Sequence, residues 1–99
     1  MRHVIVTYKL KPECVAEHLS LLGPVFDELA QIRPSGLRYA ANRAPDGVSF
    51  THIAAFEGPE NPLTSLETFQ SFVRDVRRRC EEPPRSSDVE VVGDYGLFS

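Results

Sequence analysis

The hydrophobic residues of this 99-residue chain switch between two spacings, and that pattern constrains the fold more than any other feature. Residues 3–10 alternate between two faces, which is typical of a β-strand. The more apolar face carries Val4, Val6, Tyr8 and Leu10. From Cys14 to Ile32 apolar residues recur every three or four positions, which predicts an amphipathic helix with one face on a core. Its apolar stripe consists of Val15, Leu19, Leu22, Phe26, Leu29 and Ile32.

Proline and glycine residues mark the limits of this helix. Lys11-Pro12-Glu13 fits a helix start, because proline is tolerated in the first turn and an acidic side chain faces the positive helix end. Gly23-Pro24 falls inside the stripe, yet the apolar spacing continues past it, so we expect one kinked or re-initiated helix. Residues 33–36, Arg-Pro-Ser-Gly, end it. His18 lies between the core positions and is expected to face solvent.

Two further strands are predicted at Leu37–Arg43 and Val48–Phe56, joined as a hairpin. The connection Ala44-Pro45-Asp46-Gly47 places proline, aspartate and glycine where a type I turn favours them. After a loop, Thr64 and Glu67 have the spacing of a capping box that begins a second helix. Its inward positions are Leu66, Phe69, Phe72, Val73 and Val76, and the side chains expected mostly outward are Arg74, Arg77, Arg78 and Arg79.

The chain ends with a strand predicted from about Asp88 to Leu97, after Glu81-Glu82-Pro83-Pro84 closes the second helix. The order β-α-β-β-α-β predicts one ferredoxin-like α+β domain over residues 1–99, with a four-stranded antiparallel sheet and both helices on one face. Apolar residues such as Ile5 and Ile53 also occupy the other face. We therefore expect a homodimer packed through its sheet faces; the alternative is a monomer with a mildly apolar exposed face.

Charge and cysteine content exclude several classes of function. A net charge of −3 and a pI near 5.5 argue against a nucleic-acid partner, which needs a basic surface. No apolar run approaches the roughly 20 residues that span a bilayer, so no membrane partner is expected. Cys14 and Cys80 form no disulfide framework, and a cytoplasmic location with reduced thiols is predicted. The three histidines lack metal-ligand spacing, so neither a metal nor another cofactor is assigned.

Four segments resemble the antibiotic biosynthesis monooxygenase family: residues 8–12 (Tyr-Lys-Leu-Lys-Pro), 23–29 (Gly-Pro-Val-Phe-Asp-Glu-Leu), 36–39 (Gly-Leu-Arg-Tyr) and 69–72 (Phe-Gln-Ser-Phe). The resemblance spans nearly the whole chain. It implies a dimeric α+β barrel with a small-molecule cleft between helices and sheet in each subunit. Better-known members of the family oxidise phenolic or quinol-like compounds with molecular oxygen and neither metal nor flavin, while relatives degrade haem.

His52 is the candidate catalytic residue. It shares a strand face with Phe50, Ala54 and Phe56, because strand side chains repeat with period two. The resemblance implies a polar active-site residue four positions before a tryptophan of the family, and that position is His52 here. A neutral imidazole there could accept a proton from a phenol, leaving an electron-rich anion that reacts with oxygen. The alternative is a core histidine bonded to a neighbour.

An apolar or aromatic small ligand is expected to contact four residues: Phe26, Tyr39, Phe56 and Phe72. The alternative for the phenylalanines is an ordinary core stripe, and for Tyr39 an amphipathic rim position. Family members typically carry a tryptophan, an acid and a histidine at positions occupied here by Phe56, Ala54 and Thr68. The resemblance implies a cofactor-independent monooxygenase that acts on a small phenolic, quinol or polyketide-like compound. The alternatives are a non-catalytic homodimeric ligand-binding protein and a haem-degrading relative.

Overall fold

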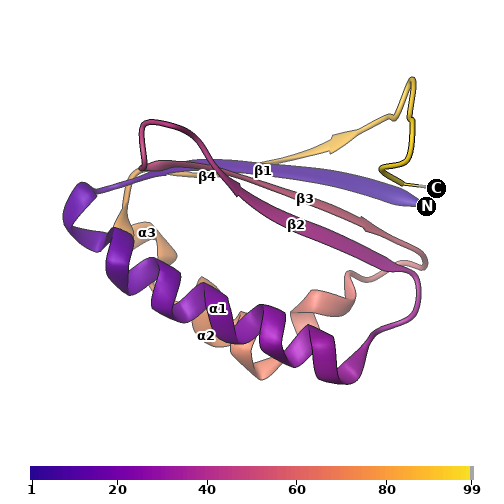
Figure 1. Ribbon diagram of the computed structural model, residues 1–99, viewed down its shortest axis with the longest axis horizontal. Coiled ribbons are helices and arrows are strands. Elements are labelled where there is room, and N and C mark those ends of the chain that lie inside the picture. The colour runs from indigo at the N-terminus through magenta and orange to yellow at the C-terminus, as the bar shows by residue number, and fades with distance from the viewer. Residues whose placement is uncertain (99) are drawn as a thin grey trace.

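One antiparallel sheet with helices on a single face makes up the fold of residues 1–98, which the computed structural model describes (Figure 1). The strands are β1 (Arg2–Leu10), β2 (Leu37–Arg43), β3 (Ser49–Phe56) and β4 (Cys80–Val89). The helices are α1 (Val15–Ile32), α2 (Glu67–Val73) and α3 (Val76–Arg79), with 3₁₀ turns at Pro12–Cys14 and Pro62–Ser65. The sheet order is β2-β3-β1-β4. This confirms the predicted α+β, ferredoxin-like class.

The β2–β3 hairpin forms as predicted, and its turn explains why. The Asp46 carboxylate accepts hydrogen bonds from the backbone N–H groups of Val48 and Ser49 at 2.9 and 2.8 Å. Gly47 has φ of 80°, a left-handed conformation that residues with a Cβ rarely adopt. These contacts fix the turn and with it the pairing of β2 with β3.

Alanine at two glycines should change stability in opposite directions. Gly47→Ala forces a Cβ into the left-handed region and places it 3.3 Å from the Arg43 guanidinium, so we expect a loss of about 1–2 kcal/mol in unfolding free energy. Gly23 lies within α1 with no atom within 4 Å of a new Cβ. Gly23→Ala should therefore gain about 0.5–1 kcal/mol. Urea denaturation measures both, and equal shifts of the same sign would contradict this account of the turn.

Helix α1 is one continuous helix with Pro24 inside it, which agrees with the prediction of a single element. Its buried face, however, is shifted from the predicted stripe. Leu19 and Ile32 are 39% and 53% exposed, whereas His18 is fully buried. The expectation that His18 faces solvent is therefore wrong. The sheet and α3 supply polar partners for its ring, so a polar side chain occupies a core position of this helix.

The second helical segment differs from its prediction as well. Asn61 caps the 3₁₀ turn by accepting from the backbone N–H of Leu63 at 3.0 Å, and α2 begins later without a side-chain cap. The predicted capping box of Thr64 and Glu67 does not form, because the Thr64 hydroxyl donates to the carbonyl of Asn61. Asp75, with φ of 62°, separates α2 from α3. The chain changes direction there, and the arginines that follow do not continue the surface of one helix.

Strand β4 begins eight residues before the predicted start, at Cys80 instead of Asp88. It contains Pro83 and Pro84, which were interpreted as part of the end of the second helix. β4 lies at the edge of the sheet and pairs only with β1, and the two prolines fall where that pairing shifts register, between Glu82 opposite Lys9 and Arg85 opposite Thr7. An edge position and an irregular register both tolerate a missing backbone N–H. Residues 90–97, most of the predicted strand, lie outside regular structure.

Candidate functional site

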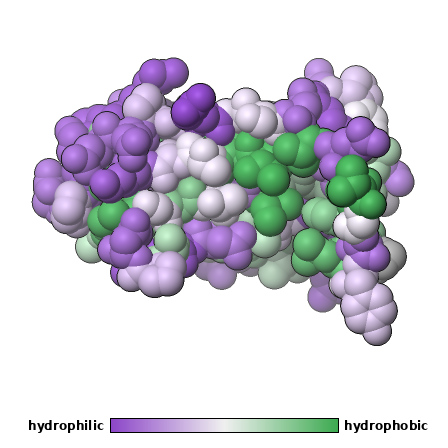
Figure 2. Space-filling model, turned by 90° about the horizontal axis from the view of Figure 1, so that it is seen from above, coloured by the Kyte–Doolittle hydropathy of each residue, from purple (hydrophilic) through white to green (hydrophobic). Residues whose placement is uncertain are grey.

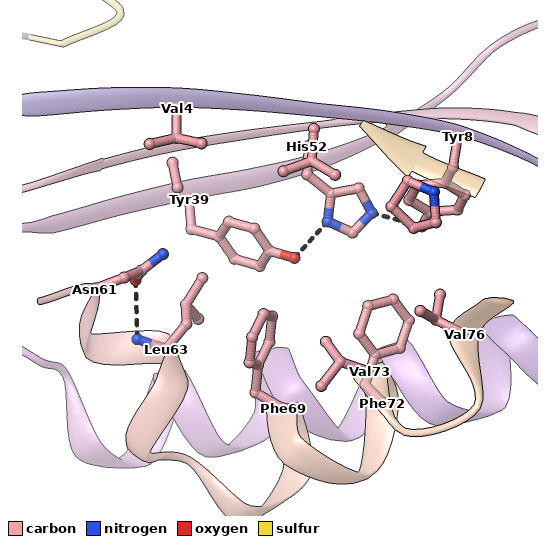
Figure 3. Close-up of a pocket in the computed structure, with 13 residues that line it drawn as sticks. Val4, Tyr8, Tyr39, His52, Asn61, Leu63, Phe69, Phe72, Val73 and Val76 are labelled. Carbon is pink, nitrogen blue, oxygen red and sulfur yellow. Dashed lines mark hydrogen bonds between the residues drawn. The ribbon is translucent and has the colours of Figure 1, made fainter. Parts of the chain in front are cut away.

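A mainly apolar cavity of about 200 Å³ lies between the sheet and the α2–α3 segment (Figure 3). Its sheet side is formed by Val4, Val6, Tyr8, Tyr39, His52 and Ala54. The opposite side is formed by Leu63, Phe69, Phe72, Val73 and Val76, with Asn61 and Pro84 at its edges. The predicted cleft between helices and sheet is therefore present, and its few polar groups come mainly from the sheet.

The strand register brings the polar groups of the cavity together. His52 pairs with Val6 of β1 and Ala41 of β2, in the centre of the sheet. Side chains two positions apart share a face, so Tyr8 and Tyr39 project on the same side as His52. His52 is only 6% exposed. It thus lies on the helix-facing side of the sheet, as the catalytic hypothesis requires.

Both ring nitrogens of His52 are bonded to tyrosines. Nδ1 lies 2.6 Å from the Tyr39 hydroxyl and Nε2 lies 2.7 Å from the Tyr8 hydroxyl. Burial lowers the pKa of His52 to about 4, so the ring is neutral near pH 7. A ligand that gave a proton directly to His52 would have to displace one of these tyrosines. The hydrogen-bonded environment foreseen in the alternative hypothesis is present, and it lies at the wall of a cavity.

The network continues away from the cavity through residues that were predicted to be exposed. The Tyr8 hydroxyl lies 2.6 Å from Nε2 of His18, and Nε of Arg79 donates to Nδ1 of His18 at 3.1 Å. Arg79 is fully buried, which corrects the prediction that it points outward. Its guanidinium also donates to the carbonyls of Phe72 and Arg74, at 2.5 and 3.1 Å. Arg79 thereby satisfies carbonyls at the end of α2.

Burial keeps the remaining groups of the network uncharged. It lowers the pKa of His18 to about 4, with a smaller contribution from the charge of Arg79. It also raises the pKa of Tyr8 and of Tyr39 well above the usual tyrosine range. Both hydroxyls therefore stay protonated near neutral pH and act as hydrogen-bonding groups, so Arg79 carries the only formal charge of this network.

The structure brings together only part of the predicted ligand-binding set. Tyr39 and Phe72 line the cavity beside His52. Phe26 lies outside that lining and stacks on the Tyr39 ring, with centroids 5.1 Å apart. Phe56 is 1% exposed and does not line the cavity, and the Arg2 guanidinium lies 5.6 Å from its ring centre. Phe69, predicted as an inward position of the second helix, lines the cavity.

Residues outside the network have structural partners of their own. Thr68 donates its backbone N–H and its hydroxyl to the Glu28 carboxylate, at 3.3 and 2.5 Å, which ties α2 to α1. Cys14 and Cys80 are free and buried, and burial raises the pKa of the Cys80 thiol. Within residues 1–98 no three His, Cys, Asp or Glu side chains gather as metal ligands. No helix in the same range is long and apolar enough to cross a membrane.

The two buried histidines predict a pH dependence of stability. Their pKa is about 4 in the folded protein against 6.5 when free, so the unfolded chain binds more protons between these values. The contribution of the two histidines to the unfolding free energy should be fully present above pH 6.5. It should fall as the pH drops toward 4, by up to about 1.4 kcal/mol per pH unit for each histidine. Urea unfolding at pH 5.0 to 7.5 measures this slope. His52→Gln should reduce it by about half, and an unchanged slope would contradict the assignment.

Solved structures share this fold over nearly the whole chain. An antibiotic biosynthesis monooxygenase is 20% identical, with 94% of this chain and 100% of the other covered and a TM-score of 0.71. SnoaB, a cofactor-independent oxygenase from Streptomyces nogalater, is 14% identical, with 96% of both chains covered and a TM-score of 0.69. Rv0793 from Mycobacterium tuberculosis is 14% identical, with 94% and 96% covered and a TM-score of 0.72. No family model and no curated protein matches the sequence. These likenesses establish the fold.

Proposed function

We propose that this chain, which has the fold of solved antibiotic biosynthesis monooxygenases, oxidises a small phenol or quinol with molecular oxygen and without a cofactor. The observation that carries the proposal is the apolar cavity with a tyrosine–histidine network at its sheet wall. An aromatic substrate fits a wall of valine and phenylalanine side chains, while Tyr39 supplies a directional polar contact. The fold adds support, because one of its solved members is a cofactor-independent oxygenase.

The proposed reaction balances without a reductant. A phenol that has lost its hydroxyl proton to solvent gives one electron to oxygen, and the resulting radical and superoxide join as a peroxide on a ring carbon. Cleavage of the O–O bond leaves a new carbonyl and releases water, which takes back the proton. Phenol and O₂ thus become quinone and water, and the substrate supplies all four electrons. An apolar cavity favours this sequence because it excludes water from the reactive intermediates.

In this proposal Tyr39 contacts the substrate and His52 acts through it. The sequence hypothesis gave His52 the role of a direct proton acceptor, which requires a ring nitrogen open to the substrate. Tyr8 and Tyr39 occupy both nitrogens. His52 instead holds the Tyr39 hydroxyl at the cavity wall, where it can donate to the substrate oxygen and stabilise the anion.

Oxygen uptake with a panel of naphthols and hydroquinones tests the proposal. An oxygen electrode should record consumption above the rate of the same compound without protein. Thermal-shift measurements on the same panel report binding independently of turnover. Compounds that bind without accelerated uptake would overturn the enzyme and leave the non-catalytic ligand-binding protein as the function of this cavity.

The structure offers little support for haem degradation. A histidine that ligates haem iron needs a ring nitrogen with a free lone pair. Both nitrogens of His18 and of His52 are already bonded within the network. Addition of haemin is therefore expected to produce no new absorption bands, and bands that vanish in a His52→Ala variant would restore this third candidate.

The homodimer predicted from the sequence is part of the proposal. Figure 2 looks onto the sheet face opposite the helices and shows apolar side chains gathered over one half of it. On this face Ile5 pairs with Ile53 across β1 and β3, and Leu97, which lines a hollow together with Ile53, is 63% exposed. A second copy packed on this face would cover these side chains.

Sedimentation at micromolar concentration should accordingly give twice the 11.1 kDa mass of the chain. Ile53→Glu places a charge in the middle of the proposed interface and should yield the single-chain mass. Glu57→Gln, at an exposed position beyond the end of β3, is the control and should keep the double mass. A wild-type protein that sediments only as single chains would overturn the dimer.

A further inference from the structure

We infer that the buried chain Arg79–His18–Tyr8–His52–Tyr39 has a single hydrogen-bond direction, which makes the Tyr39 hydroxyl a donor into the cavity. The cavity therefore takes a ligand through an oxygen that accepts a hydrogen bond, such as a carbonyl or a phenolate. This inference deepens the proposed function, since it concerns the ligand class of the same cavity. The direction is determined by which of the two atoms carries the hydrogen in each hydrogen bond of the network.

Arg79 sets the direction at the buried end. Its guanidinium carries only donors, so its Nε–H must donate to Nδ1 of His18. A neutral imidazole has one donor and one acceptor nitrogen. Because Nδ1 accepts, the hydrogen of His18 resides on Nε2 and is donated to the oxygen of Tyr8, 2.6 Å away.

Tyr8 passes the direction on to His52. A phenolic hydroxyl has one hydrogen, and two imidazole nitrogens approach the Tyr8 oxygen, from His18 and from His52 at 2.7 Å. Since His18 donates to this oxygen, the hydrogen of Tyr8 is given to Nε2 of His52. The hydrogen of His52 then resides on Nδ1, and the two histidines are opposite tautomers.

At the cavity the chain ends on Tyr39. Nδ1–H of His52 donates to the Tyr39 oxygen at 2.6 Å, so the hydrogen of Tyr39 cannot point back along this bond. Figure 3 shows the hydroxyl beside His52 and above Phe69 and Phe72, on the cavity side of the network. No other protein group among residues 1–98 accepts from it. Its hydrogen is therefore left for a ligand or for water.

The reverse direction is excluded by the charge at the buried end. If Tyr39 donated to His52, then His52 would donate to Tyr8 and Tyr8 to Nε2 of His18. Nδ1 of His18 would then carry a hydrogen facing the Nε–H of Arg79, and two donors would meet between two fully buried side chains. The buried arginine thus determines the chemical preference of a hydroxyl at the far end of the network.

Nitrogen-15 NMR of the histidine rings in the ligand-free protein tests the direction. Two-bond N–H correlation spectra distinguish the two neutral tautomers, and assignment follows from His18→Gln and His52→Gln spectra. We expect His18 with hydrogen on Nε2 and His52 with hydrogen on Nδ1 at pH 7. The same tautomer on both rings, a hydrogen on Nε2 of His52, or a charged His52 ring would each overturn the inference.

Binding of two matched probes tests the ligand preference. The ketone 1-tetralone carries one acceptor oxygen, while the hydrocarbon tetralin has nearly the same shape and none. Tyr39→Phe removes the hydroxyl and keeps the ring, so it should weaken 1-tetralone about tenfold and leave tetralin unchanged. Equal changes for both probes, or no change for either, would refute the donor role of Tyr39.

These readouts are separate from turnover. Hydrogen on Nε2 of His18 and on Nδ1 of His52, with selective loss of 1-tetralone binding in Tyr39→Phe but no oxygen uptake on any phenol, would retain the inference and reject the oxygenase. Oxygen uptake together with the reversed tautomers would do the opposite.

Discussion

Replacing Arg79 with methionine is expected to lower the unfolding free energy by about 3–5 kcal/mol, a large part of the roughly 5–15 kcal/mol that stabilises a domain of this size. Methionine retains much of the packing volume but donates no hydrogen bonds. The variant leaves the carbonyls of Phe72 and Arg74 and Nδ1 of His18 without their donor, all in or beside the core. Each buried group left unpaired costs about 1–3 kcal/mol.

Arg78→Met provides the matched control, because it changes the same residue type one position earlier. Arg78 is exposed and forms an ion pair with Glu17 on the surface. Such pairs contribute little, so this variant should unfold near the wild-type urea midpoint. Similar losses from both variants would show that the role assigned to buried Arg79 is wrong.

His52→Ala should reduce turnover by about 100-fold, and by no less than about tenfold, if Tyr39 stabilises the substrate anion as proposed. Without the imidazole, the Tyr39 hydroxyl loses the donor at 2.6 Å that directs its own hydrogen to the substrate. The anion formed during oxidation then loses a positioned hydrogen bond. The effect should fall mainly on kcat, because the apolar walls that bind the ring remain.

Steady-state oxygen uptake measures this effect, with His3→Ala as the control. His3 lies on the opposite face of the sheet, where its ring packs against Phe98 at 4.8 Å. The control should keep the wild-type rate. His52→Ala protein that is folded and equally fast would remove His52 from the mechanism.

The elements that the sequence predicted well are governed by contacts between close neighbours in the chain. The alternation of residues 3–10 matches β1, and Leu37–Arg43 coincides with β2. The turn between β2 and β3 depends on Asp46 and Gly47, whose conformational preferences are local. The single helix across Pro24 was also predicted, because the apolar spacing on both sides of the proline reported a continuous face.

Elements whose structure depends on distant partners were predicted less well. Prolines usually break strands, and Pro83 and Pro84 are accepted in β4 because they lie on an edge strand where the pairing with β1 shifts register. Arg79 belongs to a run of charged residues that is typical of an exposed helix face. The left-handed turn at Asp75 redirects it into the core, and no local pattern indicates that turn.

The candidate site shows the same division. His52 was predicted from strand alternation and the family resemblance, and Tyr39 and Phe72 as ligand contacts; all three line the cavity. His18 and Arg79 were missed because each is a polar residue at a position judged by its own helix alone. The signal that could have found them is their pairing across the fold, which a single sequence does not contain.

Oxidation under ¹⁸O₂ tests most directly whether the protein inserts an oxygen atom from O₂ into a phenol. A phenol of the panel that shows protein-dependent uptake is converted in labelled oxygen, and the quinone is examined by mass spectrometry in short reactions that limit exchange with water. The proposed reaction gives one labelled oxygen atom in each quinone, one O₂ consumed per product and no hydrogen peroxide. Unlabelled product with stoichiometric peroxide, or no product beyond the protein-free rate, would contradict it.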